Sequence, residues 1–240
     1  MSTGKQKLFT FGCSFTYGHG FPDCIVGDEG PSKHAWPYLL AKNLGVDHEN
    51  LSQPGGTAQE ILRIFLTRSN DFSPGDIITI VWPFFDRFLV TFGPELHNCW
   101  KLTPNGNNFT NHLTGTEVIV EEFYKYFSTD VLHYELFLHA SKMIHNICVE
   151  KGLHLVNYIF EKNNSRFHQN AITHPNYHWY DVKIEKVYFD IHEELWDRFN
   201  KISKEPLERL PCFHHGYAVH NFWAERVKRT LTRKGYLNGL

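Results

Sequence analysis

A serine follows the first strand signal of the sequence, at a place where α/β proteins expose reactive groups. Lys7 to Phe11 is a compact apolar run typical of a buried strand, and it leads through Gly12 to Ser14. Side chains that follow a buried parallel strand lie at the carboxyl end of the sheet, where open α/β folds bind their ligands. Ser14 is therefore the first candidate for a chemical role.

Histidines near the end of the chain and a pair of glycines are the other candidates. No H-E-x-x-H motif and no acidic residue at ligand spacing accompanies His214, His215 and His220, so we predict no metal site. A capping or core role is expected for His220. Gly55 and Gly56 do not have the G-x-G-x-x-G spacing of a dinucleotide-binding turn, so we expect no cofactor.

Strand and helix signals alternate along the chain in the order that builds a parallel sheet. The predicted helices are bounded by residues that begin or end helices, such as Thr57 before one helix and Gly152 after another. Strands joined by such helices form right-handed crossovers, which predicts an α/β fold with a mainly parallel sheet in a three-layer α/β/α sandwich. The expected strands are 7–11, 46–51, 76–82 and 153–160, and the expected helices are 36–44, 58–68, 129–149 and 220–233.

The chain is expected to form a single domain over residues 1–240. Hydrophobic residues make up 42% and charged residues 21% of the sequence, which is ordinary for a globular protein with a sizeable core. Residues 84–127 break the alternation and predict a hairpin-bearing insertion, and residues 161–209 predict a lid or a contact segment.

Charge, cysteine content and the first residues argue against several classes of protein. The 24 Lys and Arg against 26 Asp and Glu give a net charge of -2, and no basic block is present that would bind nucleic acid. Five cysteines without a C-x-x-C pair favour a reducing compartment over a disulfide framework. The polar start from Met1 to Lys7 predicts neither a signal peptide nor a membrane span, which favours a cytoplasmic protein.

Three motifs, in this order along the chain, resemble the SGNH/GDSL hydrolase-like superfamily. Gly12 to Gly18 (GCSFTYG) is similar to its first block, and Gly55 to Thr57 is similar to its second block, a glycine turn that leads a helix. His214, His220 and Ala224 keep the spacing of its last block. The resemblance implies the flavodoxin-like α/β/α fold of that superfamily.

The resemblance also implies the chemistry of a serine hydrolase without a metal or a cofactor. Ser14 Oγ would be the nucleophile, and His214 would be the general base that later protonates the leaving alkoxide. The backbone N–H groups of Ser14 and Gly55 would hold the oxyanion. His215 remains open as the base, although the block spacing favours His214. The implied activity is that of an esterase or deacetylase on an acylated carbohydrate or a small ester.

The sequence departs from the superfamily pattern in each polar position that assists the serine. Cys13 replaces the Asp of the first block, and Phe85 stands where the third block supplies an Asn to the oxyanion hole. Pro211 and Cys212 occupy the places of the Asp that orients the catalytic His. Loss of one oxyanion donor costs roughly 10²- to 10³-fold in rate, and loss of the orienting acid costs about 10⁴-fold in serine proteases.

Three other residues are candidates to compensate for these losses. Asp86 or Glu208 would orient His214 if either carboxylate folds toward it, and Arg87 would assist the oxyanion. All three predictions require contacts between segments that are distant in the sequence.

A catalytically degenerate protein is the alternative, with the fold kept for a structural or carbohydrate-binding role. The motif Phe11 to Thr16 (FGCSFT) is similar to SGNH-like proteins of tailed phages, which makes a phage virion the alternative to a cytoplasmic setting. The expected partners are then a glycan, virion proteins or a second copy of the chain. Neither nucleic acid nor a membrane is expected as a partner.

Overall fold

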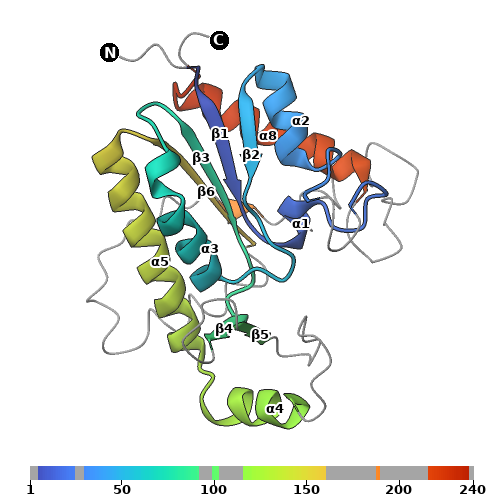
Figure 1. Cartoon of the computed structure of the whole chain (residues 1–240), viewed down its shortest axis with the longest axis vertical. Coiled ribbons are helices and arrows are strands. Elements are labelled where there is room, and N and C mark those ends of the chain that lie inside the picture. The colour runs from blue at the N-terminus through green and yellow to red at the C-terminus, as the bar shows by residue number, and fades with distance from the viewer. Residues whose placement is uncertain are drawn as a thin grey trace.

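A parallel sheet forms the centre of the molecule (Figure 1). The computed structural model describes residues 5–24, 30–91, 99–102, 116–160, 188–189 and 216–237. Over these ranges the sheet has five strands in the order β2-β1-β3-β6-β7, and each neighbouring pair is parallel. Counted in chain order this arrangement is 2-1-3-4-5, as in flavodoxin-like folds. The strands are β1 (Lys7–Phe11), β2 (Asp47–Asn50), β3 (Ile77–Trp82), β6 (His154–Phe160) and β7 (Tyr188–Phe189).

Helices cover both faces of the sheet, which confirms the predicted three-layer sandwich. The helices are α2 (Trp36–Leu44) and α8 (Tyr217–Arg233) on one face, and α3 (Ala58–Thr67) and α5 (Asp130–Lys151) on the other. Successive residues of a strand face opposite layers, so Leu8 packs beneath α2 and α8 while Phe9 packs beneath α3 and α5. All six residues of β3 are buried, as expected for a strand covered on both faces.

Helix caps in the sequence mark the helix ends in the structure. Thr57 Oγ1 accepts a hydrogen bond from the backbone N–H of Glu60 (3.1 Å) and begins α3. Thr129 Oγ1 accepts one from the N–H of Leu132 (3.1 Å) and begins α5. Gly152 ends α5 with a φ of 67°, in the left-handed region that favours glycine. These local interactions explain why the helix boundaries could be predicted.

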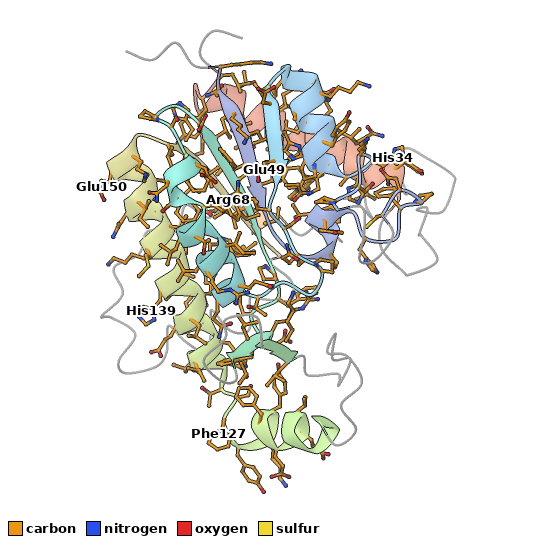
Figure 2. The ribbon with its side chains drawn as sticks, viewed as in Figure 1. His34, Glu49, Arg68, Phe127, His139 and Glu150 are labelled. Carbon is orange, nitrogen blue, oxygen red and sulfur yellow. The ribbon has the colours of Figure 1, made fainter. Side chains whose placement is uncertain are left out.

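Between β3 and α5 the chain forms a hairpin and a helix. They are β4 (Phe88–Thr91) and β5 (Cys99–Leu102), which pair antiparallel, and α4 (Thr116–Tyr126). The Tyr124 hydroxyl lies 2.5 Å from the carbonyl oxygen of Asp86 and 3.0 Å from that of Leu102, so it ties α4 to the hairpin. Figure 1 shows the hairpin beyond the carboxyl ends of β1 and β3. Figure 2 shows Phe127 still further out. The side chain of this residue is exposed to solvent.

The structure leaves one predicted segment largely undescribed and bears on the predicted lack of a membrane span. The predicted lid or contact segment, residues 161–209, lies outside the described residues apart from β7. None of the helices in the described ranges is long and apolar enough to cross a membrane.

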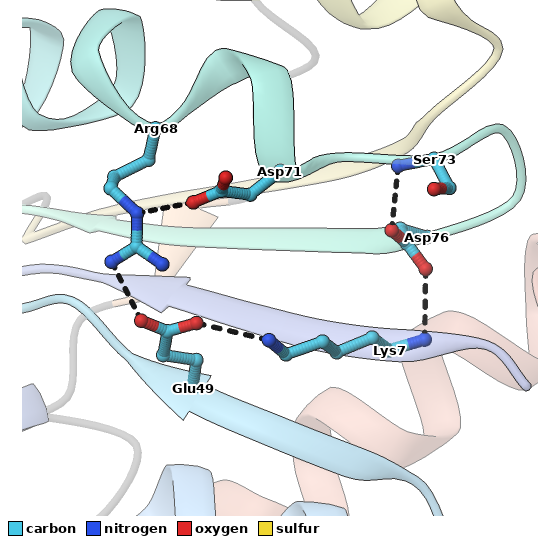
Figure 3. Close-up of polar contacts among 6 residues, drawn as sticks. All are labelled: Lys7, Glu49, Arg68, Asp71, Ser73 and Asp76. Carbon is cyan, nitrogen blue, oxygen red and sulfur yellow. Dashed lines mark hydrogen bonds and ion pairs between the residues drawn. The ribbon is translucent and has the colours of Figure 1, made fainter.

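A network of charged groups ties β2 to the end of α3 (Figure 3). Glu49 on β2 pairs with the Arg68 guanidinium (2.6 Å) and with Lys7 Nζ on β1 (3.0 Å). Arg68 also pairs with Asp71. Partial burial opposes ionisation of Glu49, but the hydrogen bonds from Arg68 and Lys7 hold the pKa of this carboxyl below its ordinary value. The network therefore stabilises the fold only while Glu49 is charged.

Replacement of Glu49 by glutamine is expected to make the free energy of unfolding less dependent on pH in the acidic range. Because the folded-state pKa is lowered, the stabilisation is present above the ordinary glutamate pKa of about 4.3 and is lost as the pH falls through the folded-state value. At pH 7 we expect Glu49→Gln to lower the free energy of unfolding by about 1 kcal/mol, because the pairs are partly exposed to solvent. Urea denaturation at several pH values measures this difference.

The matched control is Asp47→Asn on the same strand, since the Lys5–Asp47 pair is 59% and 70% exposed. This control is expected to change stability by less than about 0.5 kcal/mol. A gap between Glu49→Gln and the unmodified protein that stays constant below about pH 4 would contradict the role of the Glu49 charge.

Candidate active site

Ser14 begins a single helical turn at the carboxyl end of β1. This turn is α1 (Ser14–Tyr17), and the Ser14 carbonyl accepts hydrogen bonds from the N–H groups of Gly18 and His19, both at 3.0 Å. The flanking residues Cys13 and Phe15 are 3% and 6% exposed and belong to the core beneath α2 and α8. Ser14 itself is partly exposed. The buried neighbours thus hold a partly exposed serine at the end of the strand.

The second motif packs directly against this loop. In the glycine turn, Gln53–Thr57, the N–H of Gln53 donates to the carbonyl oxygen of Gly12 (3.1 Å). A Cβ on Gly56 would lie 2.9 Å from that same oxygen and 3.5 Å from Cys13 Cα. Gly55 adopts a φ of 67°, in the left-handed region. The structure therefore brings the backbones of the Ser14 loop, after β1, and the glycine turn, after β2, together at the carboxyl end of the sheet.

Asn50 strengthens the same junction from the end of β2. Its Nδ2 donates to the carbonyl oxygen of Thr16 in α1 (2.8 Å), and its Oδ1 accepts from the N–H of Ser52 (3.1 Å). One amide side chain thereby links the first turn after β1 to the chain that enters the glycine turn.

A methyl group on Gly56 is expected to disrupt this junction. Gly56→Ala should lower the free energy of unfolding by about 1–3 kcal/mol, because the added Cβ meets two backbone oxygens, those of Gly12 and Gln53, at 2.9 and 3.0 Å. Backbone atoms move less readily than the end of a flexible side chain. Denaturant titration of the purified variant measures the loss.

Gly75→Ala is the comparison variant. This residue has a φ of 91° and no atom within 4 Å of its Cβ position, so it incurs backbone strain of about 1 kcal/mol without a clash. If Gly56→Ala loses no more free energy of unfolding than Gly75→Ala does, the predicted clash of the Gly56 Cβ with the backbone is wrong.

Phe85, in the segment after β3, stands where an Asn side chain would donate to the oxyanion. Phe85 is 4% exposed and stacks on Phe137 of α5, with ring centroids 4.2 Å apart. It therefore belongs to the core. The next residues lie beside the insertion: the Arg87 guanidinium is 4.9 Å from the centre of the Phe84 ring, and the Asp86 carbonyl accepts from Tyr124.

The charges of Asp86 and Arg87 affect the pKa of Tyr124. Burial raises the pKa of its hydroxyl above the ordinary value, the Asp86 carboxylate raises it further, and the Arg87 cation opposes both effects. Asp86 and Arg87 are thus both close to Tyr124 of α4. Their predicted action on His214 or on an oxyanion stays a prediction.

The first turn of the last helix, α8 (Tyr217–Arg233), packs against Phe15, the residue after Ser14. His220 is 1% exposed; its Nδ1 accepts a hydrogen bond from the N–H of Trp36 at the start of α2 (2.9 Å), and its ring lies 4.7 Å from that of Phe15. This confirms the expected capping or core role of His220. The helix starts at Tyr217, three residues before the predicted start, with Gly216 as its N-cap.

Two predicted site residues, His214 and Glu208, and the alternative base His215 lie outside the described residues. His214, His215 and Glu208 precede Gly216, the first described residue of the carboxyl-terminal segment. In the ranges that the structure describes, no group of three His, Cys, Asp or Glu side chains is arranged to hold a metal ion.

Sequence reasoning missed Lys101 of β5. Its Nζ donates to the carbonyl oxygen of Pro54 in the glycine turn (2.9 Å) and lies 3.0 Å from Glu60 Oε2 on α3. A glutamate on the buried side of the predicted helix was the available signal, because a buried carboxylate requires a partner. The partner itself comes from a hairpin that local sequence patterns do not place.

Comparisons with known proteins agree with this geometry at the level of the fold. No protein-family model and no curated protein matches the chain. Among solved structures, a member of the lipolytic G-D-S-L family from Veillonella parvula is 13% identical, with 95% of this chain and 99% of that chain covered and a TM-score of 0.50. An acetyl xylan esterase from Butyrivibrio proteoclasticus is 11% identical, with 98% and 66% covered and a TM-score of 0.52.

A third similar structure is a carbohydrate esterase whose active site is said to display divergent catalytic and non-catalytic binding functions. It is 13% identical, with 99% of this chain and 72% of that chain covered and a TM-score of 0.52. Such low identity carries information on the fold alone. The chain has the SGNH/GDSL hydrolase-like fold, as the order of its motifs predicted.

Proposed function

We propose that this chain is an SGNH-type serine hydrolase that cleaves esters, with Ser14 as the nucleophile. The observation that supports this most is the backbone junction between Gly12 and Gly56. It sets Ser14 and the Gly55 turn against each other at the carboxyl end of a flavodoxin-like sheet, which is the ligand-binding edge of such folds. A serine next to backbone N–H donors is the arrangement that acyl transfer requires.

In the proposed mechanism, Ser14 Oγ attacks the acyl carbonyl carbon while the general base takes the hydroxyl proton. The N–H groups of Ser14 and Gly55 stabilise the negative charge on the carbonyl oxygen. The tetrahedral intermediate then expels the alkoxide, which takes the proton back from the base. Water repeats the sequence on the acyl-enzyme, and the products are an alcohol and a carboxylic acid.

His214 is the proposed base. It lies two positions before Gly216, the N-cap of α8, and this end of α8 lies at the Ser14 loop because His220 contacts Phe15. The two intervening peptide units allow a Cα displacement of at most about 7.6 Å from Gly216. This short reach favours His214, and equally its neighbour His215, over histidines on other elements.

An acylated carbohydrate or a small ester is the proposed substrate. The support is analogy, since acetyl xylan and other carbohydrate esterases share the fold. Turnover of acetylated oligosaccharides compared with simple acetate esters would separate the two classes.

The second candidate is a binding protein that has kept the fold without the reaction. Phe85 favours it, because a core phenylalanine at this position offers no side-chain donor to an oxyanion. Loss of such a donor costs roughly 10²- to 10³-fold in rate. A glycan or a virion protein would then be the partner, in a phage particle or in the cytoplasm.

Ester turnover and covalent labelling separate the two candidates. We expect the purified protein to hydrolyse p-nitrophenyl acetate and to react with a fluorophosphonate probe, and we expect Ser14→Ala to abolish both, because the probe bonds to an activated serine oxygen. Ser69→Ala is the matched control, since Ser69 lies in the short 3-10 helix that follows α3. Probe labelling that persists in Ser14→Ala would exclude Ser14 as the nucleophile, and glycan binding without any turnover would support the binding protein.

A further inference from the structure

Lys101 joins the hairpin to the glycine turn through a nearly buried ion pair. Its Nζ lies 3.0 Å from Glu60 Oε2 and 2.9 Å from the carbonyl oxygen of Pro54, to which it donates. The side chains of Lys101 and Glu60 are 17% and 6% exposed. Charges this far out of water interact much more strongly than the exposed pairs on the surface of the protein.

The atom that Lys101 contacts belongs to the peptide group that contains the Gly55 N–H. A peptide group is planar, and this one is trans, so the Pro54 carbonyl and the Gly55 N–H point in opposite directions in one plane. A hydrogen bond that fixes the carbonyl therefore also fixes the direction of the N–H. This N–H is the second oxyanion donor of the proposed function.

The charge of Lys101 affects the strength of that donor as well as its direction. An ammonium group at the oxygen end of an amide draws electron density from the nitrogen, so the N–H becomes more positive and donates more strongly. Glu60 holds the ammonium in place, and it is itself held at the first turn of α3, because its N–H donates to Thr57 Oγ1.

We propose that Lys101 is a positioning residue of the oxyanion site: it orients and polarises the Pro54–Gly55 peptide group, so that the hairpin β4–β5 completes the site. Figure 1 shows this hairpin beyond the carboxyl end of the sheet and next to the start of α3. This inference rests on the proposed function, because it assigns a role to an oxyanion donor. The inference gives the hairpin β4–β5, which belongs to the insertion, a role in supporting catalysis.

Steady-state kinetics with p-nitrophenyl acetate test the inference. Lys101→Met is expected to lower kcat about 10-fold, less than the roughly 10²- to 10³-fold that follows loss of a whole donor, and to leave KM within about twofold. Lys101→Arg keeps the charge and is expected to recover most of kcat. Lys125→Met is the matched control, because Lys125 lies on α4 of the same insertion and pairs with Glu122 at the surface.

Lys101→Met removes the nearer of two cations that pair with the buried Glu60 carboxylate and leaves Arg63, whose guanidinium lies 3.9 Å from Glu60 Oε1, so the single variant is expected to lose stability. The double variant Lys101→Met/Glu60→Gln removes that charge and carries the same expected loss of kcat. An increase in KM with an unchanged kcat would overturn the inference. A folded double variant with full kcat would overturn it as well.

The ¹⁵N and amide proton signals of Gly55 provide a readout that needs no turnover. They are expected to shift in Lys101→Met and in the double variant, because Lys101 contacts this peptide group, and to stay unchanged in Lys125→Met, because Lys125 pairs with Glu122 at the surface. Unchanged Gly55 signals in a folded Lys101 variant would exclude the proposed orientation. If Ser14→Ala retains full activity while the Gly55 signals shift, the proposed function fails and its oxyanion role fails with it, but the contact itself stands.

Discussion

The backbones of Gly12 and Gly56 meet with no room for a side chain on either residue, and the candidate site depends on this contact. A Cβ on Gly12 would lie 2.3 Å from Thr16 Oγ1, and one on Gly56 would lie 2.9 Å from the Gly12 carbonyl oxygen. The order of the sheet makes the contact possible, because β1 lies between β2 and β3 and the loops after β1 and β2 leave the same edge. Chemistry at Ser14 requires this close approach of two loops.

The support around this contact comes from three directions. Asn50 links the end of β2 to α1, His220 links α8 to the start of α2, and Lys101 links the hairpin to the glycine turn. Each link is a hydrogen bond between a side chain and a backbone group, and each joins segments that are distant in the sequence. The site is therefore held by tertiary contacts, whereas the strands beneath it are held by the core on both faces.

Local patterns predicted what local interactions determine. The apolar runs of β1 and β3, the Thr57 cap and the Gly152 helix end all appear in the structure as expected, because each depends on neighbouring residues. The Lys101–Glu60 pair was missed for the opposite reason: a hairpin lysine reaches α3 only after the sheet has formed. Phe85 shows a third case, since the sequence predicts that it replaces an oxyanion donor, whereas its packing on Phe137 of α5 explains the aromatic side chain.

A crystal structure of the protein after reaction with a fluorophosphonate tests the central claim most directly, because the adduct mimics the tetrahedral intermediate. We predict that phosphorus is bonded to Ser14 Oγ and that the phosphoryl oxygen lies about 3 Å from the backbone nitrogens of Ser14 and Gly55. An adduct on another residue, or a phosphoryl oxygen that points away from Gly55, would contradict the claim that the junction of these two loops forms an oxyanion site.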